Sequence, residues 1–96
     1  MRFEWDEEKN RTNKATHKIA FETARLVFDD PRMLNVLDHV VDDEERWQTL
    51  GMVSGVIVIV AHTYREQDGI EKIRLISAGK ATPGERRSYD ESWQVP

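Results

Sequence analysis

The sequence predicts an α+β domain in which helices pack on one face of a small antiparallel sheet. The first observation is the apolar run Val56–Ala61, because every residue but the last is β-branched and favours an extended backbone. Polar residues do not alternate within this run, so we expect a central strand covered on both faces. The second observation is a pair of two-residue turn sequences, Ser54-Gly55 and Asp68-Gly69, which predict hairpins on either side of this strand.

The first third of the chain predicts a short strand and two helices. The strand is Phe3–Trp5, and Asp6 is the expected N-cap of a helix that ends near Lys18, because acidic residues fill its first turn. A second helix is predicted over Phe21–Phe28, where apolar residues have helical spacing, and Pro31 follows its end. The expected buried stripe of the first helix comprises Trp5, Lys9, Thr12, Ala15 or Thr16, and Ile19.

The rest of the chain predicts the sheet and a closing helix. Thr82 and Glu85 form a capping box around Pro83, so the last helix is expected over residues 83–90. Residues 64–69 are expected to form a loop between two strands. The strands themselves are expected over residues 34–41, 46–53, 56–63 and 70–78.

Length and composition describe one ordinary globular domain. Its 96 residues are 39% hydrophobic and 33% charged, which is typical of a folded chain. We assign residues 1–91 to the domain and residues 92–96 to a C-terminal tail. The lack of cysteine excludes disulfides, thiol catalysis and zinc–thiolate sites. Met1–Asp6 lacks the apolar core of a signal peptide, and no apolar run approaches the roughly 20 residues of a membrane span. We therefore expect a cytoplasmic protein without membrane contact.

The charges are unevenly distributed along the chain. The net charge of −4 argues against a general nucleic-acid binder, because the summed field repels phosphates. Residues 38–45 contain five acidic residues and no lysine or arginine, whereas residues 72–87 contain five basic residues and only Glu85 as an acid. The C-terminal third is therefore compatible with a local basic patch, and the alternative is a set of solvated charges on an ordinary surface.

Several kinds of catalytic site find no support in the sequence. His17, His39 and His62 form no pair with the spacing of metal ligands, and no serine lies in a Gly-x-Ser-x-Gly turn. The remaining polar residues suit phosphodiester cleavage by side chains alone, in which cations hold the phosphate while an acid and a base move protons. The alternative is that His62 is structural and the arginines are solvated. This constellation comprises His62, Arg65, Arg74, Ser77, Lys80, Arg86 and Tyr89.

Three motifs resemble those of one protein family. These motifs are Phe3–Lys9 with Asn13, Ile73–Ala78, and Glu85-Arg86-x-x-Tyr89. With them the chain resembles the BrnT-type toxins of type II toxin–antitoxin systems from Phe3 to about Tyr89. The resemblance implies a RelE-like fold and a ribonuclease that blocks translation without a metal or cofactor. It also implies a BrnA-like antitoxin, which neutralises the toxin in a hetero-oligomer and is the component that binds DNA to repress their operon.

The resemblance turns the polar constellation into an expected RNA-cleaving site. The expected catalytic residues are His62, Arg74, Lys80, Arg86 and Tyr89. The expected RNA-binding residues are Arg46, Arg65, Ser77 and Arg87. Arg46, Arg74 and Arg86 would hold phosphate, His62 or Lys80 would transfer protons, and Tyr89 would stack on or orient a base.

The chain departs from the family pattern in two segments. Gly79 replaces the usual arginine, and Thr16-His17-Lys18 replaces the usual Lys-His-Gly. Loss of a phosphate-holding arginine would remove a charge-assisted contact of roughly 1.5–3 kcal/mol. The alternative function is therefore a catalytically weakened or inactive homologue, which binds the antitoxin in operon autoregulation.

Overall fold

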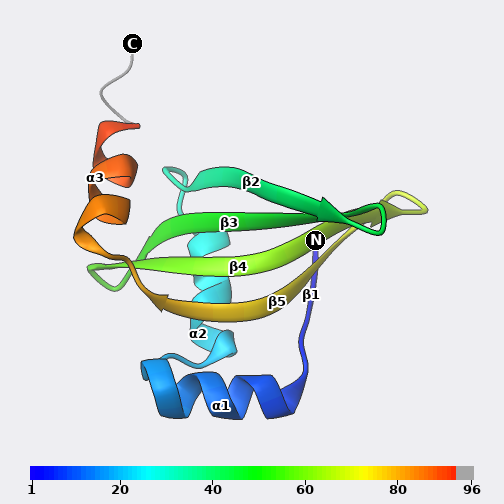
Figure 1. Cartoon of the computed structure of the whole chain (residues 1–96), viewed down its shortest axis with the longest axis horizontal. Helices are drawn as coiled ribbons and strands as arrows, with labels where there is room; N and C mark the ends of the chain where they lie inside the picture. The colour runs from blue at the N-terminus through cyan, green and yellow to red at the C-terminus, as the bar shows by residue number, and fades with distance from the viewer. Residues whose placement is uncertain (93–96) are drawn as a thin grey trace.

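Five strands form a single mixed sheet in the order β1-β5-β4-β3-β2 in the computed structural model, which describes residues 1–92 (Figure 1). The strands are β1 (Arg2–Glu4), β2 (Leu34–Val41), β3 (Glu44–Val53), β4 (Val56–Gln67) and β5 (Ile70–Lys80). β2 to β5 form an antiparallel meander, and β1 pairs with β5 in parallel. The predicted α+β class is therefore confirmed. The predicted tail, residues 92–96, lies outside the described residues except for Ser92.

Each hairpin of the meander closes through a turn of two residues with positive φ. These turns are Asp42-Asp43 (51° and 64°), Ser54-Gly55 (50° and 81°) and Asp68-Gly69 (54° and 77°). This conformation matches the right-handed twist of paired strands, and the two predicted hairpin turns are confirmed. Residues 64–67 extend β4 instead of forming the predicted loop, because their pairing with β5 continues up to the turn.

The two faces of the sheet are covered differently. α2 (Phe21–Ala24) and the 3-10 helix η1 (Arg25–Asp29) together replace the single predicted second helix. They pack on what we call the helix-side face, which carries Val58, Val60, Ile73 and Leu75. The opposite face, which we call the open face, carries Ile57, Ile59, Ala61 and Thr63 from β4. The sequence predicts cover on both faces of β4, but the two faces differ: Val58 and Val60 are buried, whereas Ile57 and Ile59 are only half-buried.

α1 (Glu7–His17) completes the exposed edge of β5. β1 pairs only with residues 72–74, and farther along the strand the side chain of Asn13 takes the place of a neighbouring strand. Its Nδ2 donates to the carbonyl of Ala78 at 2.9 Å, and its Oδ1 accepts from the Ala78 N–H at 3.0 Å. Asn10 Oδ1 accepts from the Phe21 N–H at 2.8 Å and joins α1 to α2.

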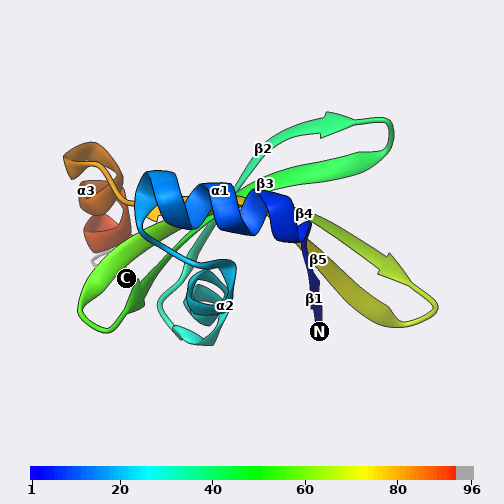
Figure 2. The same ribbon diagram turned by 90° about the horizontal axis from the view of Figure 1, so that it is seen from below.

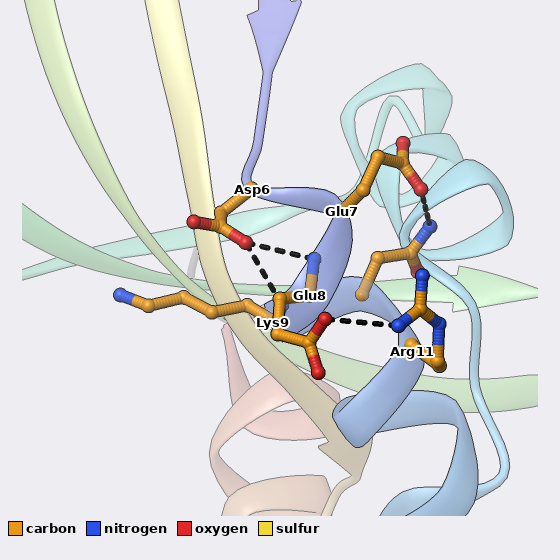
Figure 3. A network of polar contacts seen from close by, with 6 residues as sticks. Asp6, Glu7, Glu8, Lys9 and Arg11 are labelled. Atoms are coloured by element: carbon orange, nitrogen blue, oxygen red, sulfur yellow. Dashed lines mark hydrogen bonds and ion pairs between the residues drawn. The ribbon is translucent and has the colours of Figure 1, made fainter.

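The residues of α1 that face the protein differ from the predicted stripe. Asn10 and Asn13 are buried, whereas Lys9, Thr12, Ala15 and Thr16 are exposed. The predicted start of α1 is confirmed, because Asp6 Oδ1 accepts from the N–H groups of Glu8 and Lys9 (Figure 3). No helix within residues 1–92 is long and apolar enough to cross a membrane.

α3 (Pro83–Glu91) lies on the other side of the sheet from α2, and α1 runs along the edge between them (Figure 2). The sequence predicts that all the helices share one face of the sheet, and this prediction is wrong. The predicted capping box is confirmed, because Thr82 Oγ1 accepts from the Glu85 N–H and Glu85 Oε1 accepts from the Thr82 N–H. This cap directs α3 across one end of the open face.

Candidate active site

Two arginines from different strands converge on one carboxylate on the open face. Arg46, Thr63 and Arg74 lie side by side on β3, β4 and β5, so their side chains share a face. We call these three residues the arginine row. Glu44 Oε1 lies 2.9 Å from Arg74 Nη2 and 3.5 Å from Arg46 Nη2. Glu44 thus contacts both guanidinium groups, and Glu4 on β1 lies beside Arg74 in the same row, so two carboxylates accompany the two arginines.

The arginine row also contains an unsatisfied donor. Within residues 1–92, the Nε of Arg46 is buried and has no hydrogen-bond partner. Leaving such a donor unpaired costs about 1–3 kcal/mol. Because this nitrogen is buried, an anionic oxygen could pair with it only after the Arg46 side chain rearranges.

A cavity of about 300 Å³ opens on the same face of the sheet, between α1, β5 and α3. Gln48 and Ser77 lie one row beyond Arg46 and Arg74, or about 7 Å along the strands. His17, the last residue of α1, closes one side because Asn13 anchors that helix to β5. The polar residues that line the cavity are His17, Gln48, Ser77, Lys80 and Glu85.

Gly79 leaves space beside His17. A β-carbon placed at Gly79 would lie 3.6 Å from the His17 Nδ1, which is an ordinary van der Waals contact, and the φ of this glycine is not in the left-handed region. A larger side chain at position 79 is therefore sterically acceptable and would begin at the wall of the cavity.

A second hollow, of about 880 Å³, separates α3 from the β3–β4 hairpin. Lys80, Arg86 and Arg87 line it together with Asp90 and Glu91. Lys80 borders both this hollow and the smaller cavity. The structure thus brings together three of the predicted cations, but Arg74 lies six residues before Lys80 on β5, or about 20 Å away.

His62 lies on the helix-side face, away from the arginine row. Its Nε2 is 2.7 Å from the Thr49 hydroxyl, and its ring packs edge-on against Phe28 with ring centroids 4.9 Å apart. Burial lowers the pKa of His62, and its hydrogen bond with the Thr63 carbonyl opposes this shift only in part. The structure does not bring this predicted catalytic residue together with the cations.

Tyr89 lies one turn after Arg86 on α3, but its side chain is buried and lines neither of these two cavities. Its hydroxyl donates to Asp30 Oδ2 at 2.5 Å. Burial, followed by this hydrogen bond and the charge of Asp30, raises the pKa of Tyr89 to about 12. Arg65, a predicted RNA-binding residue, is exposed near the far end of β4 and pairs across the sheet with Lys72.

Sequence reasoning missed three residues of this site. His17 was considered as a metal ligand and within Thr16-His17-Lys18, where it matches the histidine of the family's Lys-His-Gly, but it was not predicted as a site residue, and neither were Glu44 and Gln48. Besides that match, the signal for His17 was its place at the end of α1, immediately before Lys18, which ends the helix in the left-handed conformation with φ of 63°. Its position beside β5 depends on the contacts of Asn13, which no local pattern predicts.

The chain belongs to a family of ribonuclease toxins. Residues 5–85 match the family described as "Ribonuclease toxin, BrnT, of type II toxin-antitoxin system". BrnT is thus the family to which the protein is assigned, and a toxin of this type implies an antitoxin partner. No curated protein matches the chain. The matched range includes His17, Arg46, Arg74 and Lys80, and it ends before Arg86, Arg87 and Tyr89.

Proposed function

We propose that this protein is a metal-independent endoribonuclease with a RelE-like fold, which blocks translation in the cytoplasm until a BrnA-like, DNA-binding antitoxin neutralises it. One observation carries the proposal. A cavity lined by His17, Ser77 and Lys80 opens on the same sheet face as Arg46 and Arg74. Family membership supports the ribonuclease class, and the geometry suggests which residues act.

RNA would bind with its phosphates along the open face. Arg74 and Arg46 present guanidinium groups that can donate two hydrogen bonds each to phosphate oxygens. A phosphate at the arginine row would replace one of the two ion pairs of Glu44, whose carboxylate then continues to orient the other arginine. The adjacent nucleotide would lie over the cavity, one row farther along the sheet.

The reaction would begin with attack by the ribose 2′-hydroxyl. The neutral imidazole of His17 takes the hydroxyl proton, the 2′-oxygen forms a bond to phosphorus, and the bond between phosphorus and the 5′-oxygen breaks. The ammonium of Lys80 gives its proton to that leaving oxygen. The products are a 2′,3′-cyclic phosphate and a 5′-hydroxyl, and Arg74 holds a neighbouring phosphate at the arginine row, which positions the scissile bond over the cavity.

Expression without the antitoxin tests this assignment. Wild-type protein should arrest growth and degrade RNA, whereas Arg74→Ala and His17→Ala should do neither. Arg11→Ala is the matched control, because Arg11 is exposed on α1 and contacts Glu8 (Figure 3). Growth arrest at wild-type strength by the Arg74 and His17 variants would overturn the proposed site.

The departure at Gly79 favours the second candidate function, an antitoxin-binding module without nuclease activity. Gly79→Arg distinguishes the two, because the added side chain has room beside His17. A nuclease should be toxic with either residue and gain about tenfold in rate from one charge-assisted contact. Toxicity that appears only with arginine would instead favour the inactive module.

A further inference from the structure

The helix-side face contains a cavity for which the proposed reaction has no use. This cavity, of about 260 Å³, lies beyond η1, where the helices no longer cover the sheet. Phe28, Trp47 and Tyr64 contribute aromatic rings from η1, β3 and β4, and His62 also lines it. The open face and its arginine row lie on the other side of the sheet.

Two carboxylates give this aromatic cavity a negative charge. Glu45 Oε1 accepts from Trp47 Nε1 at 3.2 Å, and Glu71 Oε1 accepts from the Tyr64 hydroxyl at 3.4 Å. Burial and the nearby charge of Glu71 raise the pKa of Tyr64. Among residues 1–92, no lysine or arginine lines the cavity.

An exposed apolar strip continues from the cavity to the edge of the sheet. Leu37 pairs with Trp47 and Val40 pairs with Glu45, so both β2 residues share the face of the cavity. Leu37 is 46% exposed and Val40 is 58% exposed. β2 is the last strand of the sheet, so its outer edge has no strand partner within residues 1–92.

We propose that this aromatic–acidic cavity binds an arginine or lysine side chain of a partner protein, whose apolar residues cover Leu37 and Val40. The cavity fits such a side chain in two respects. Its rings accommodate the apolar stem and attract the cation by cation–π interaction, and Glu45 and Glu71 accept charge-assisted hydrogen bonds. In naming the partner as the antitoxin, the inference rests on the proposed function.

The negative charge of this surface favours a basic protein segment over RNA as its ligand. The adjoining hairpin carries Asp42 and Asp43 in its turn, and both lie outside the cavity. Together with Glu45 and Glu71 they repel a phosphate backbone and attract a basic peptide. A protein segment with alternating apolar and basic residues therefore matches the surface, whereas a nucleic acid does not.

A peptide titration tests the cavity in the whole protein. The probe is the acetylated and amidated tripeptide Val-Arg-Val, compared with the same peptide carrying citrulline, which is similar in shape and uncharged. The readout is the NMR signal of the Trp47 indole N–H, assigned by its loss in Trp47→Phe. We expect a saturable shift with the arginine peptide and at least tenfold weaker binding of the citrulline peptide, from loss of charge-assisted bonds.

Two pairs of variants with the same change in charge distinguish binding in the cavity from attraction by nearby acidic residues outside it. Glu45→Gln with Glu71→Gln should weaken binding of the arginine peptide at least tenfold. Asp42→Asn with Asp43→Asn removes the same charge from the turn, where asparagine tolerates positive φ, and should change binding less than twofold. Equal weakening by both pairs, or equal binding of both peptides, would overturn the inference.

RNA cleavage by the same variants keeps the two proposals distinct. Glu45 and Glu71 lie outside the proposed active site, so their glutamine variants should cleave RNA at the wild-type rate. Absence of peptide binding in a protein that cleaves RNA would count against the cavity alone. Peptide binding by a protein that does not cleave RNA would count against the nuclease alone.

Discussion

Tyr89 and Asp30 join elements that lie on opposite sides of the sheet. The Tyr89 hydroxyl on α3 donates to Asp30 Oδ2 at 2.5 Å, and the same oxygen accepts from the backbone N–H of Met52 on β3 at 2.8 Å. Burial alone would raise the pKa of Asp30, but the hydrogen bonds from Tyr89 and from the backbone of Met52 and Arg32 lower it. The carboxylate therefore holds α3 against β3 in its ionised form.

Removal of the Tyr89 hydroxyl should destabilise the fold. Tyr89→Phe loses a hydrogen bond to a charged group in a buried position, so the free energy of unfolding should fall by about 1.5–3 kcal/mol. Urea denaturation measures the change. Ser88→Ala is the control, because the neighbouring hydroxyl is exposed and should matter by less than about 0.5 kcal/mol. An equal effect of the two variants would contradict the role of the Asp30 bond.

His62 should make stability depend on pH. Its pKa is lower in the folded protein than the usual 6.5, because burial disfavours the charged imidazole. As the pH falls, the unfolded chain therefore binds a proton at His62 before the folded protein does. The contribution of neutral His62 to stability is complete above pH 6.5 and is lost as the pH falls through the pKa of His62 in the folded protein. His62→Gln should flatten the dependence of the unfolding free energy on pH below 6.5, which urea denaturation at a series of pH values measures, and an unchanged slope would contradict this assignment.

Two glycines in the sheet should differ in how much substitution by alanine destabilises the fold. A β-carbon at Gly51 would lie 2.7 Å from the Val27 Cβ and 2.8 Å from its carbonyl oxygen, whereas one at Gly79 meets only His17 at 3.6 Å or more. Gly51→Ala should therefore cost about 1–3 kcal/mol through overpacking of η1 against β3. Gly79→Ala should cost less than about 0.5 kcal/mol in the same thermal or urea measurement. A similar loss in both variants would show that steric contact does not explain the choice of glycine.

Asn13 should be essential for docking α1 on the sheet. Asn13→Ala leaves the N–H and carbonyl of Ala78 without their partners, so we expect a loss of about 2–4 kcal/mol. Thr12→Ala, at the neighbouring exposed position, should be nearly neutral. Hydrogen exchange of the Ala78 amide is the local readout, and it should become much faster only in the Asn13 variant. Retained protection would mean that α1 docks without this side chain.

Local chemistry predicted the ends of elements better than their packing. Asp6 and the Thr82–Glu85 pair began helices as predicted, since a cap depends only on neighbouring residues. The Ser54-Gly55 and Asp68-Gly69 turns likewise formed hairpins. The uninterrupted apolar run in β4 carried no alternation, so it could not tell the helix-side face from the open face.

Arg46, Arg74, Ser77 and Lys80 were predicted as site residues, whereas His17 escaped prediction for a related reason. Asn10 and Asn13 are polar and were expected on the solvent side, yet their amides satisfy backbone groups of Phe21 and Ala78. That long-range pairing brings His17 to β5 and forms the cavity. His62 and Tyr89 had suitable side chains for catalysis, but their burial depends on packing against residues far away in the sequence.

Cleavage of RNA on the open face should depend on the 2′-hydroxyl of the substrate and on His17 as the base. The most direct measurement is the rate at which purified protein cleaves a single-stranded RNA, compared with the same strand carrying 2′-O-methyl groups. We expect 2′,3′-cyclic phosphate ends from the unmodified strand alone, and a rate at least about a hundredfold lower for His17→Ala. Cleavage of the 2′-O-methyl strand at an equal rate, or full activity of the His17 variant, would contradict the account.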